Sequence, residues 1–240
     1  MSLSKNQLKL ITSLQQKKYR TSNNLFITEG TKVVKEYLDS NFELEQLFCV
    51  DNSGYENIEN VIRISEVELK KISSLKTPNN VLALFKIPSE QPIKKEGLIL
   101  ALDEINDPGN LGTIIRLCDW FGVEQLICSK NTVDCYNSKV VQASMGSLTR
   151  VSIVYTDLGT YLQSVDLPKY ATLMYGESVY KSLLPKNAIL VMGNEANGIS
   201  AEILKLLTKS ISIPRFGNLQ QTESLNVATA TAILLSEFKR

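Results

Sequence analysis

The stretch that decides the fold lies near the end of the sequence and reads Ser210-Ile-Ser-Ile-Pro-Arg-Phe-Gly-Asn-Leu-Gln-Gln-Thr-Glu-Ser-Leu-Asn-Val-Ala-Thr-Ala230. A short β-rich run ends at Pro214, and a polar loop follows. The chain then enters a small-residue helix through Ser224, Leu225 and Asn226. Free backbone N–H groups and polar side chains at a strand-to-helix corner suit ligand binding. Taken alone, the stretch also fits a well-capped terminal helix.

The composition is that of a globular protein. The chain has 240 residues, of which 43% are hydrophobic and 21% charged, and both values are ordinary for such proteins. Its apolar runs, such as 97–102 and 188–192, are strand-sized and shorter than the roughly 18 residues that span a bilayer. The first ten residues lack the apolar core of a signal peptide. We therefore expect a cytoplasmic protein, built as one large α/β domain or as a small domain and a medium one.

The absence of histidine restricts the chemistry. The sequence contains none, and its four cysteines (Cys49, Cys118, Cys128 and Cys135) form no C-x-x-C pair. Zinc sites of the usual spacing, a disulfide framework and imidazole-based hydrolysis are therefore not expected, and we expect no metal. Catalysis would have to use carboxylates, Arg, Lys, Ser, Tyr or a cofactor.

Positive charge is concentrated at the start of the chain. The net charge is only +1, but the first twenty residues carry several cations and no acid. These cations are Lys5, Lys9, Lys17, Lys18 and Arg20. A basic helix of this kind can neutralise RNA phosphates, and it can equally be a solvated surface. The residues alone leave both interpretations open.

The pattern of strands and helices predicts two domains. Residues 1–92 form a small α/β unit, with helices over 4–16 and 31–39 and from 65, strands over 25–30, 44–50, 61–64 and 81–85, and a polar turn at 21–24. A Pro-rich, charged linker follows at 88–95. Residues 93–240 alternate strands at 98–102, 125–128, 151–155, 171–174, 188–192 and 211–213 with helices at 111–121, 138–145, 158–165, 201–207 and 224–238. This alternation predicts a parallel sheet covered on both faces, with ligands at the carboxyl ends of its strands.

A second corner with polar residues runs from Asp103 to Arg116, after the strand at 98–102. Pro108 and Gly109 set a tight turn there. Asn110 and Arg116 are six positions apart, nearly two helical turns, on broadly similar faces. The stretch is neither a G-x-G-x-x-G fingerprint nor a Walker loop. Each residue also has an ordinary interpretation, Asn110 as a helix cap and Arg116 as a surface or ion-pair residue.

A third corner runs from Ile189 to Gly198, where a buried strand enters a loop. Gly193 and Gly198 flank Glu195, and the backbone of such a loop can wrap a flat ligand. An ordinary strand-to-helix turn, with Ser200 capping the next helix, fits the same residues.

The order of the three corners resembles a known family. Asn-x-Gly-x-x-x-Arg at 110–116, Gly-x-Glu-x-x-Gly at 193–198, and Ile-Pro followed by Ser-Leu-Asn-Val within 213–227 are similar to the three motifs of the SpoU/TrmH-type RNA 2′-O-ribose methyltransferases. The stretch 136–148 is similar to the segment between the first two motifs. The resemblance covers about residues 95–240 and implies a SPOUT-class α/β domain with a deep C-terminal trefoil knot. More weakly, residues 1–90 resemble the family's N-terminal substrate-binding domain, through 17–20 and 26–30.

The resemblance implies a cofactor and a set of site residues. S-adenosyl-L-methionine would be held mainly by backbone groups of Met192, Gly193, Ile213, Leu225 and Asn226. The residues implied in catalysis are Arg116, Asn110, Glu195, Ser224 and Asn226. With the basic segment included, the residues expected to bind RNA are Lys17, Lys18, Arg20 and Arg116. The resemblance also implies a homodimer through the knotted domain and a ribosomal or transfer RNA substrate.

Arg116 matches the family's catalytic arginine, and three roles are open to it. A guanidinium with a pKa above about 12 is a poor base, so clamping a phosphate or stabilising an alkoxide is physically easier. A base role requires a pKa lowered by several units. The sequence departs from the family at Arg215, where methionine is common, at Trp120, at Ala228, and in a longer loop at 216–223. These departures leave details of the cofactor pocket and the choice of substrate open.

Two other classes of protein fit part of the pattern. A non-catalytic RNA-binding protein would keep the knot as a scaffold but would not need the whole polar set. A nicotinamide-dependent dehydrogenase fits the strand-helix alternation, but its glycine fingerprint and acidic ribose ligand are missing. The sequence therefore predicts methyl transfer from S-adenosyl-L-methionine to a ribose 2′-hydroxyl of RNA.

Overall fold

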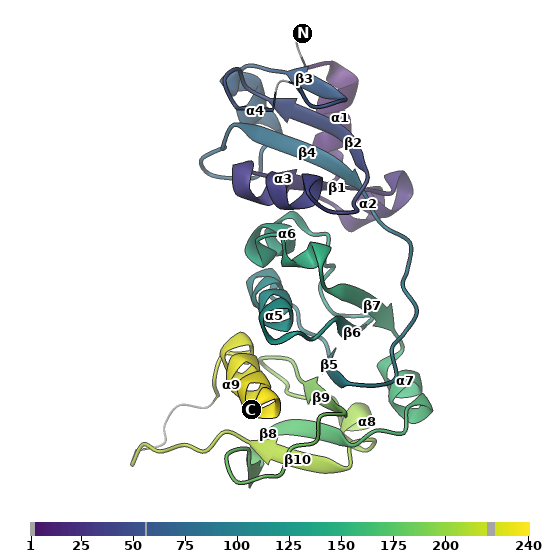
Figure 1. Cartoon of the computed structure of the whole chain (residues 1–240), viewed down its shortest axis with the longest axis vertical. Coiled ribbons are helices and arrows are strands. Elements are labelled where there is room, and N and C mark those ends of the chain that lie inside the picture. Colours follow the sequence, from purple (N-terminus) through teal and green to yellow (C-terminus); the bar gives the residue numbers. More distant parts are fainter. Residues whose placement is uncertain (1–2, 56, 220–223) are drawn as a thin grey trace. The chain divides into compact units, whose positions relative to one another are not determined.

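A computed structural model describes residues 3–55, 57–219 and 224–240 (Figure 1). The chain forms two compact units. The first comprises Met1–Ser89 together with Asp134–Thr149, and the second comprises Glu90–Val133 together with Arg150–Arg240. The N-terminal unit thus takes in a segment from the range 93–240, which the sequence pattern assigned to the second domain.

The N-terminal unit is built on a four-stranded sheet. Its strand order is β1 (Leu25–Glu29), β4 (Val81–Lys86), β2 (Leu44–Cys49) and β3 (Val61–Arg63). The β2–β3 pair is parallel, and β4 pairs antiparallel with β1 and with β2. The helices are α1 (Lys5–Ser13), α2 (Lys17–Asn23), α3 (Thr31–Leu38), α4 (Glu66–Ile72), α6 (Ser138–Ser144) and the short 3-10 helix η1 (Ser147–Thr149). Ile11, Phe48 and Leu82 are buried together in one core of this unit.

The prediction of a polar turn at 21–24 was wrong. Residues Lys17–Asn23 form α2, which ends where Asn24 adopts a left-handed conformation with a φ of 54°. The Arg20 guanidinium, inside this helix, donates to the carbonyl oxygens of Leu14 (2.8 Å) and Gln15 (3.1 Å) and pairs with Asp134. The sequence window around α2 could not reveal this, because Asp134 lies 114 positions away.

The second unit confirms the predicted parallel sheet. Its six strands are β10 (Lys209–Ser212), β8 (Lys169–Ser178), β9 (Ala188–Met192), β5 (Leu98–Leu102), β6 (Gln125–Ser129) and β7 (Ser152–Thr156), in that spatial order. Every neighbouring pair is parallel. All five residues of β6 and of β9 are buried, as expected for strands covered on both faces.

Helices cover both faces of this sheet (Figure 1). On one face α7 (Leu158–Ser164) and α8 (Ala201–Leu204) pack with β5 and β9 through Leu162, Ile203 and Val191. On the other face α5 (Pro108–Phe121) and α9 (Val227–Lys239) lie side by side. The last helix begins at Val227 rather than at Ser224, because the Asn226 side chain caps it.

Strand β8 leaves its ladder beside β10. Ala171 is aligned with Ser210, but the next aligned pair is Glu177 with Ile211, so residues 172–176 lie outside the regular pairing. Met174 and Tyr175 in this excursion are exposed. The excursion begins at the edge of the sheet where the carboxyl ends of β5, β9 and β10 meet.

Candidate active site

The three corners identified in the sequence meet at one edge of the parallel sheet. Asn110, at the start of α5, donates from Nδ2 to Oε1 of Glu195 at 2.7 Å. Asn226, before α9, donates from Nδ2 to Oδ1 of Asn110 at 2.9 Å. The structure thus joins one side chain from each corner in a single hydrogen-bonded chain.

Hydrogen bonds at the starts of α5 and α9 hold Asn110 and Asn226 in place. Asp107 is the N-cap of α5, and its side chain accepts from the backbone N–H of Asn110 at 2.7 Å. Oδ1 of Asn226 accepts from the N–H groups of Ala228 and Thr229 at 3.0 and 3.2 Å. Asn110 is therefore three residues after the cap rather than the cap itself. The Asn226 side chain both caps its helix and orients Asn110.

Arg116 takes no part in the hydrogen bonds that join Asn110, Glu195 and Asn226. Its side chain is exposed on α5, about 9 Å along the helix axis from Asn110 at 1.5 Å per residue. It forms no hydrogen bond or ion pair with any other residue that the structure describes. Trp120, one turn further along the same face, is 84% exposed. Arg116 therefore keeps its donors available for a substrate.

A cavity of about 580 Å³ opens beside the corners. Four of the five predicted cofactor residues, Met192, Gly193, Ile213 and Leu225, line it, and so do Glu195 and Ser224. Asn226 does not line this cavity. Ser224 and Leu225 are exposed in the segment that leads to α9. Residues 220–223 of the predicted long loop at 216–223 lie outside the described residues.

The loop after β9 is held closed by its own hydrogen bonds. The backbone N–H and C=O of Asn194 exchange hydrogen bonds with those of Gly198, at 2.9 and 2.8 Å. Oδ1 of Asn194 accepts from the N–H groups of Ala196 (2.8 Å) and Asn197 (3.1 Å), and its Nδ2 donates to the Glu104 carbonyl at 2.7 Å. A side chain at Gly193 would meet the Gly198 carbonyl carbon at 2.2 Å.

A buried carboxylate fixes the far end of the same loop. Asp103, at the end of β5, is 4% exposed, and its Oδ2 accepts from the backbone N–H of Ser200 at 2.8 Å. Neither Asp103 nor Asn194 is among the site residues predicted from the sequence. Their position within the second and third corners was the available signal, because Asn and Asp at loop ends commonly bond to nearby backbone N–H groups.

Other wall residues were also missed. Thr172, Leu173 and Met174 line the cavity from the β8 excursion. Arg215, the departure from the family pattern that was expected to bear on this pocket, also lines it, from the segment after β10. Arg215 Nη2 lies 3.6 Å from Sδ of Met174. No sequence signal identifies the β8 residues, because their place depends on the strand order β10-β8-β9.

The predicted RNA-binding residues of the first unit have two different environments. Lys17 and Lys18 are exposed on α2. Arg20 is 3% exposed, and its guanidinium bonds to Asp134 and to two carbonyl oxygens. The assignment of Arg20 to RNA contact is therefore corrected, because its donors are used inside the fold.

Neither a metal cluster nor an ionised Cys118 thiol is present in the described part of the chain. There, no group of three or more His, Cys, Asp or Glu side chains is arranged to hold a metal ion. Burial raises the pKa of the Cys118 thiol on α5, so this thiol stays protonated at neutral pH. None of the described helices is long and apolar enough to cross a membrane.

Two family comparisons match most of the chain. The SpoU rRNA Methylase family matches residues 97–236, and the MRM3-like substrate binding domain matches residues 5–83. The chain belongs to the SpoU rRNA methylase family. It is an RNA methyltransferase that uses S-adenosyl-L-methionine, and the prediction from the three motifs is confirmed. The catalytic interpretation is favoured over a non-catalytic RNA-binding protein.

Relatives cover nearly the whole chain. It is 30% identical over 230 residues to the 23S rRNA (guanosine(2553)-2′-O)-methyltransferase RlmP of Bacillus subtilis, covering 92% of this chain and 91% of the relative. A TrmH-family structure from Porphyromonas gingivalis is 38% identical, with a TM-score of 0.88 and 98% of each chain covered. The AdoMet-bound rRNA methyltransferase from Sinorhizobium meliloti is 27% identical, with a TM-score of 0.87, covering 100% of this chain and 97% of that one.

The cavity suits the methyl donor. Its volume lies within the roughly 300–1,000 Å³ of small-molecule sites. Met192, Ile211 and Leu234 supply apolar wall, and the Gly193–Gly198 loop supplies backbone groups. The close approach of Gly193 to Gly198 leaves no room for a side chain, so backbone rather than side-chain atoms face the cavity at this point.

Proposed function

We propose that this chain methylates the ribose 2′-hydroxyl of a guanosine in ribosomal RNA. The relatives RlmP of Bacillus subtilis and RlmB of Neisseria meningitidis carry that activity in their names. The observation that supports the proposal best is the hydrogen-bonded series Asn226–Asn110–Glu195 beside the cavity. Mapping 2′-O-methyl sites in ribosomal RNA from cells with and without the gene tests it. Identical ribosomal RNA maps from the two kinds of cell would contradict the substrate assignment.

In this proposal the cavity residues bind the cofactor through the backbone. Met192, Gly193, Ile213 and Leu225 bind S-adenosyl-L-methionine, which supplies an activated methyl group when bound. Asn226, which does not line the cavity, acts by orienting Asn110 rather than by touching the cofactor. The knot implied by the resemblance belongs to the same proposal. The alignment of α9 with α5 and the bond from Asn226 to Asn110 support a C-terminal segment threaded near the second corner, Asp103–Arg116.

Arg116 orients the reacting hydroxyl. Its exposed guanidinium, without an ion pair in the described part of the chain, clamps the phosphate of the target nucleotide and stabilises negative charge on the ribose oxygen in this proposal. We expect Arg116→Ala to bind S-adenosyl-L-methionine normally in calorimetry but to transfer no methyl group to ribosomal RNA from cells lacking the gene. Normal turnover would overturn the assignment. Substantial activity of Arg116→Lys would favour a simple charge over a bidentate clamp.

Glu195 is the group of this chain that can accept the hydroxyl proton. Asn110 holds one carboxylate oxygen, and Glu195 itself is exposed at the cavity. Glu195→Gln keeps an acceptor for Asn110 but removes the charge. If Glu195 receives the proton, this variant loses turnover while its cofactor affinity is unchanged. If Glu195 only positions Asn110, the variant keeps most of its turnover.

We also infer that the chain acts as a homodimer through its methyltransferase unit, and that residues 1–92 bind the substrate. Trp120, 84% exposed one turn after Arg116 on α5, supports an interface there, since aromatic residues are enriched at protein–protein interfaces. Sedimentation of the wild type and of Trp120→Glu tests this. A wild-type monomer would refute the dimer.

A further inference from the structure

The segment Asp134–Thr149 belongs to the N-terminal unit by packing. It lies inside the range 97–236 of the methylase match, yet it clusters with Met1–Ser89. The Tyr136 ring lies 4.7 Å from the Phe26 ring between centroids, and α6 packs on β1 with Val140 and Val141 buried. The substrate-binding unit is therefore completed by residues from outside its own family match at 5–83.

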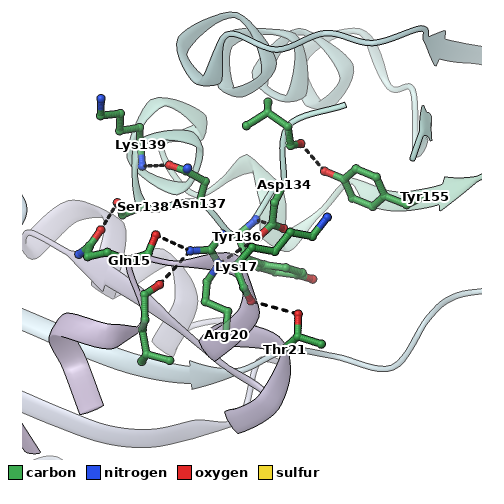
Figure 2. A network of polar contacts seen from close by, with 12 residues as sticks. Gln15, Lys17, Arg20, Thr21, Asp134, Tyr136, Asn137, Ser138, Lys139 and Tyr155 are labelled. Atoms are coloured by element: carbon green, nitrogen blue, oxygen red, sulfur yellow. Dashed lines mark hydrogen bonds and ion pairs between the residues drawn. The ribbon is translucent and has the colours of Figure 1, made fainter. Parts of the chain in front are cut away.

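A polar network joins this segment to the turn between α1 and α2 (Figure 2). Arg20 Nε and Nη2 donate to Oδ2 of Asp134 at 2.9 and 2.5 Å. The Ser138 hydroxyl donates to Oε1 of Gln15 at 2.9 Å. Two independent contacts thus fix the start of α6 beside the start of α2.

Three exposed lysines stand on the two helices that this junction joins. Lys17 and Lys18 stand on α2, and Lys139 follows Ser138 at the start of α6; all three are exposed. Figure 2 shows the Lys17 and Lys139 ammonium groups pointing away from the network. The Lys139 side chain has no hydrogen-bonding or ionic partner among the residues that the structure describes.

The carboxylate in this network is compensated within the fold. Asp134 is the acid at the junction, and the buried Arg20 compensates it. The exposed Glu36 lies at the opposite end of α6, against Gly146. Tyr19, 37% exposed, adds an aromatic face below the Lys18 ammonium, 4.6 Å from the ring centroid. Exposed ammonium groups are the groups that contact the phosphates of an RNA backbone.

We propose that Lys139 joins Lys17 and Lys18 in one phosphate-binding surface of the N-terminal unit. Lys139 lies within the range of the methylase match, whereas Lys17 and Lys18 lie within that of the substrate-binding domain. This inference deepens the proposed function and rests on RNA being the substrate. The predicted RNA-binding surface thus gains Lys139, from a segment far away in the sequence, and loses Arg20, which is buried. Because phosphate contacts do not depend on sequence, the surface holds and orients RNA without selecting the target nucleotide.

The test is the salt dependence of RNA binding. Fluorescence anisotropy of an RNA hairpin, without cofactor, gives the slope of log affinity against log salt for the full chain. We expect Lys139→Ala to reduce the magnitude of this slope by about 1, as Lys17→Ala and Lys18→Ala each do, and the triple variant by about 2 to 3. Lys139→Arg should retain the wild-type slope. Cofactor affinity in calorimetry should stay unchanged in all of them.

Two exposed lysines serve as matched controls. Lys130→Ala, nine positions before Lys139 but in the other unit, and Lys70→Ala on α4 should leave the slope unchanged. If Lys139→Ala behaves like these controls while Lys17→Ala weakens binding, the inference is refuted. Failure of the proposed function has a different signature, because a wild-type chain that binds RNA but transfers no methyl group leaves these slopes intact.

Discussion

Gly193→Ala tests the reasoning about the cofactor loop most directly. Gly193 enters the loop directly after β9, and a Cβ placed there would lie 2.2 Å from the Gly198 carbonyl carbon and 2.3 Å from the Ile199 nitrogen. Ordinary contacts begin near 3.4 Å. Both neighbours are backbone atoms, so no side chain can rotate away to make room. The loop must move by about 1 Å.

The expected loss of cofactor affinity can be estimated from the hydrogen bonds that this movement of the loop breaks. The two backbone hydrogen bonds between Asn194 and Gly198, at 2.9 and 2.8 Å, would lengthen beyond useful range. Each contributes about 0.5–1.5 kcal/mol, and overpacking costs about 1–3 kcal/mol. In the variant the free loop relaxes and has to be forced back for the cofactor to bind. A penalty of about 2–6 kcal/mol weakens binding by about 30-fold or more, since 1.4 kcal/mol is tenfold.

Calorimetric titration with S-adenosyl-L-methionine measures this loss, and circular dichroism checks that the fold is retained. Gly217→Ala is the matched control, because a Cβ at Gly217 meets nothing within 4 Å. It should bind the cofactor as the wild type does. Binding of Gly193→Ala within threefold of the wild type would refute the close-approach argument.

Three further outcomes follow from the structure. Asp134→Ala leaves the 3% exposed Arg20 guanidinium without its anion and should lower the free energy of unfolding by about 3–5 kcal/mol in urea titrations; a loss below 1 kcal/mol would show that the pair is not structural. Asn194→Ala removes the side-chain bonds that hold the loop to the Glu104 carbonyl, and should weaken cofactor binding at least tenfold, whereas Gln142→Ala on α6 should not. The pKa of Glu68 is lowered from its ordinary value of 4.5 because the backbone N–H groups of Ser65 and Leu3 donate to its carboxylate. The ionised carboxylate therefore stabilises the folded protein above pH 4.5, and this stabilisation is lost as the pH falls through the lower pKa of the folded state. Thermal melts of Glu68→Gln should therefore depend less on pH in this acid range than those of the wild type, and parallel profiles would count against this assignment.

Much of the fold could be predicted from the sequence because each strand is identified by its own short run of apolar residues. The apolar runs at 98–102 and 188–192 form β5 and β9 with the predicted ends, and the buried pattern of β9 identifies a strand covered on both faces. The corners follow parallel strands, so their meeting at one edge of the sheet follows from topology alone. Asn110, Glu195 and Asn226 were therefore selected together correctly as neighbours, although their roles in catalysis stay proposals.

What failed depended on distant partners. Residues 21–24 look like a turn locally, but Arg20 bonds to Asp134 and to two carbonyl oxygens, and α2 forms over Lys17–Asn23. The cavity walls from β8 follow from strand order, which spacing in the sequence does not encode.

The sequence by itself determined the parallel sheet, the three corners and the family, because periodicity and motif spacing act over short ranges. Only the tertiary structure decided that Arg20 is buried, that Asn194 and Asp103 hold the Gly193–Gly198 loop, and that Asp134–Thr149 completes the N-terminal unit. The physical reason is the same in each case. A buried charge or a closed loop needs hydrogen-bonding partners, and the fold supplies them from residues far away in the chain.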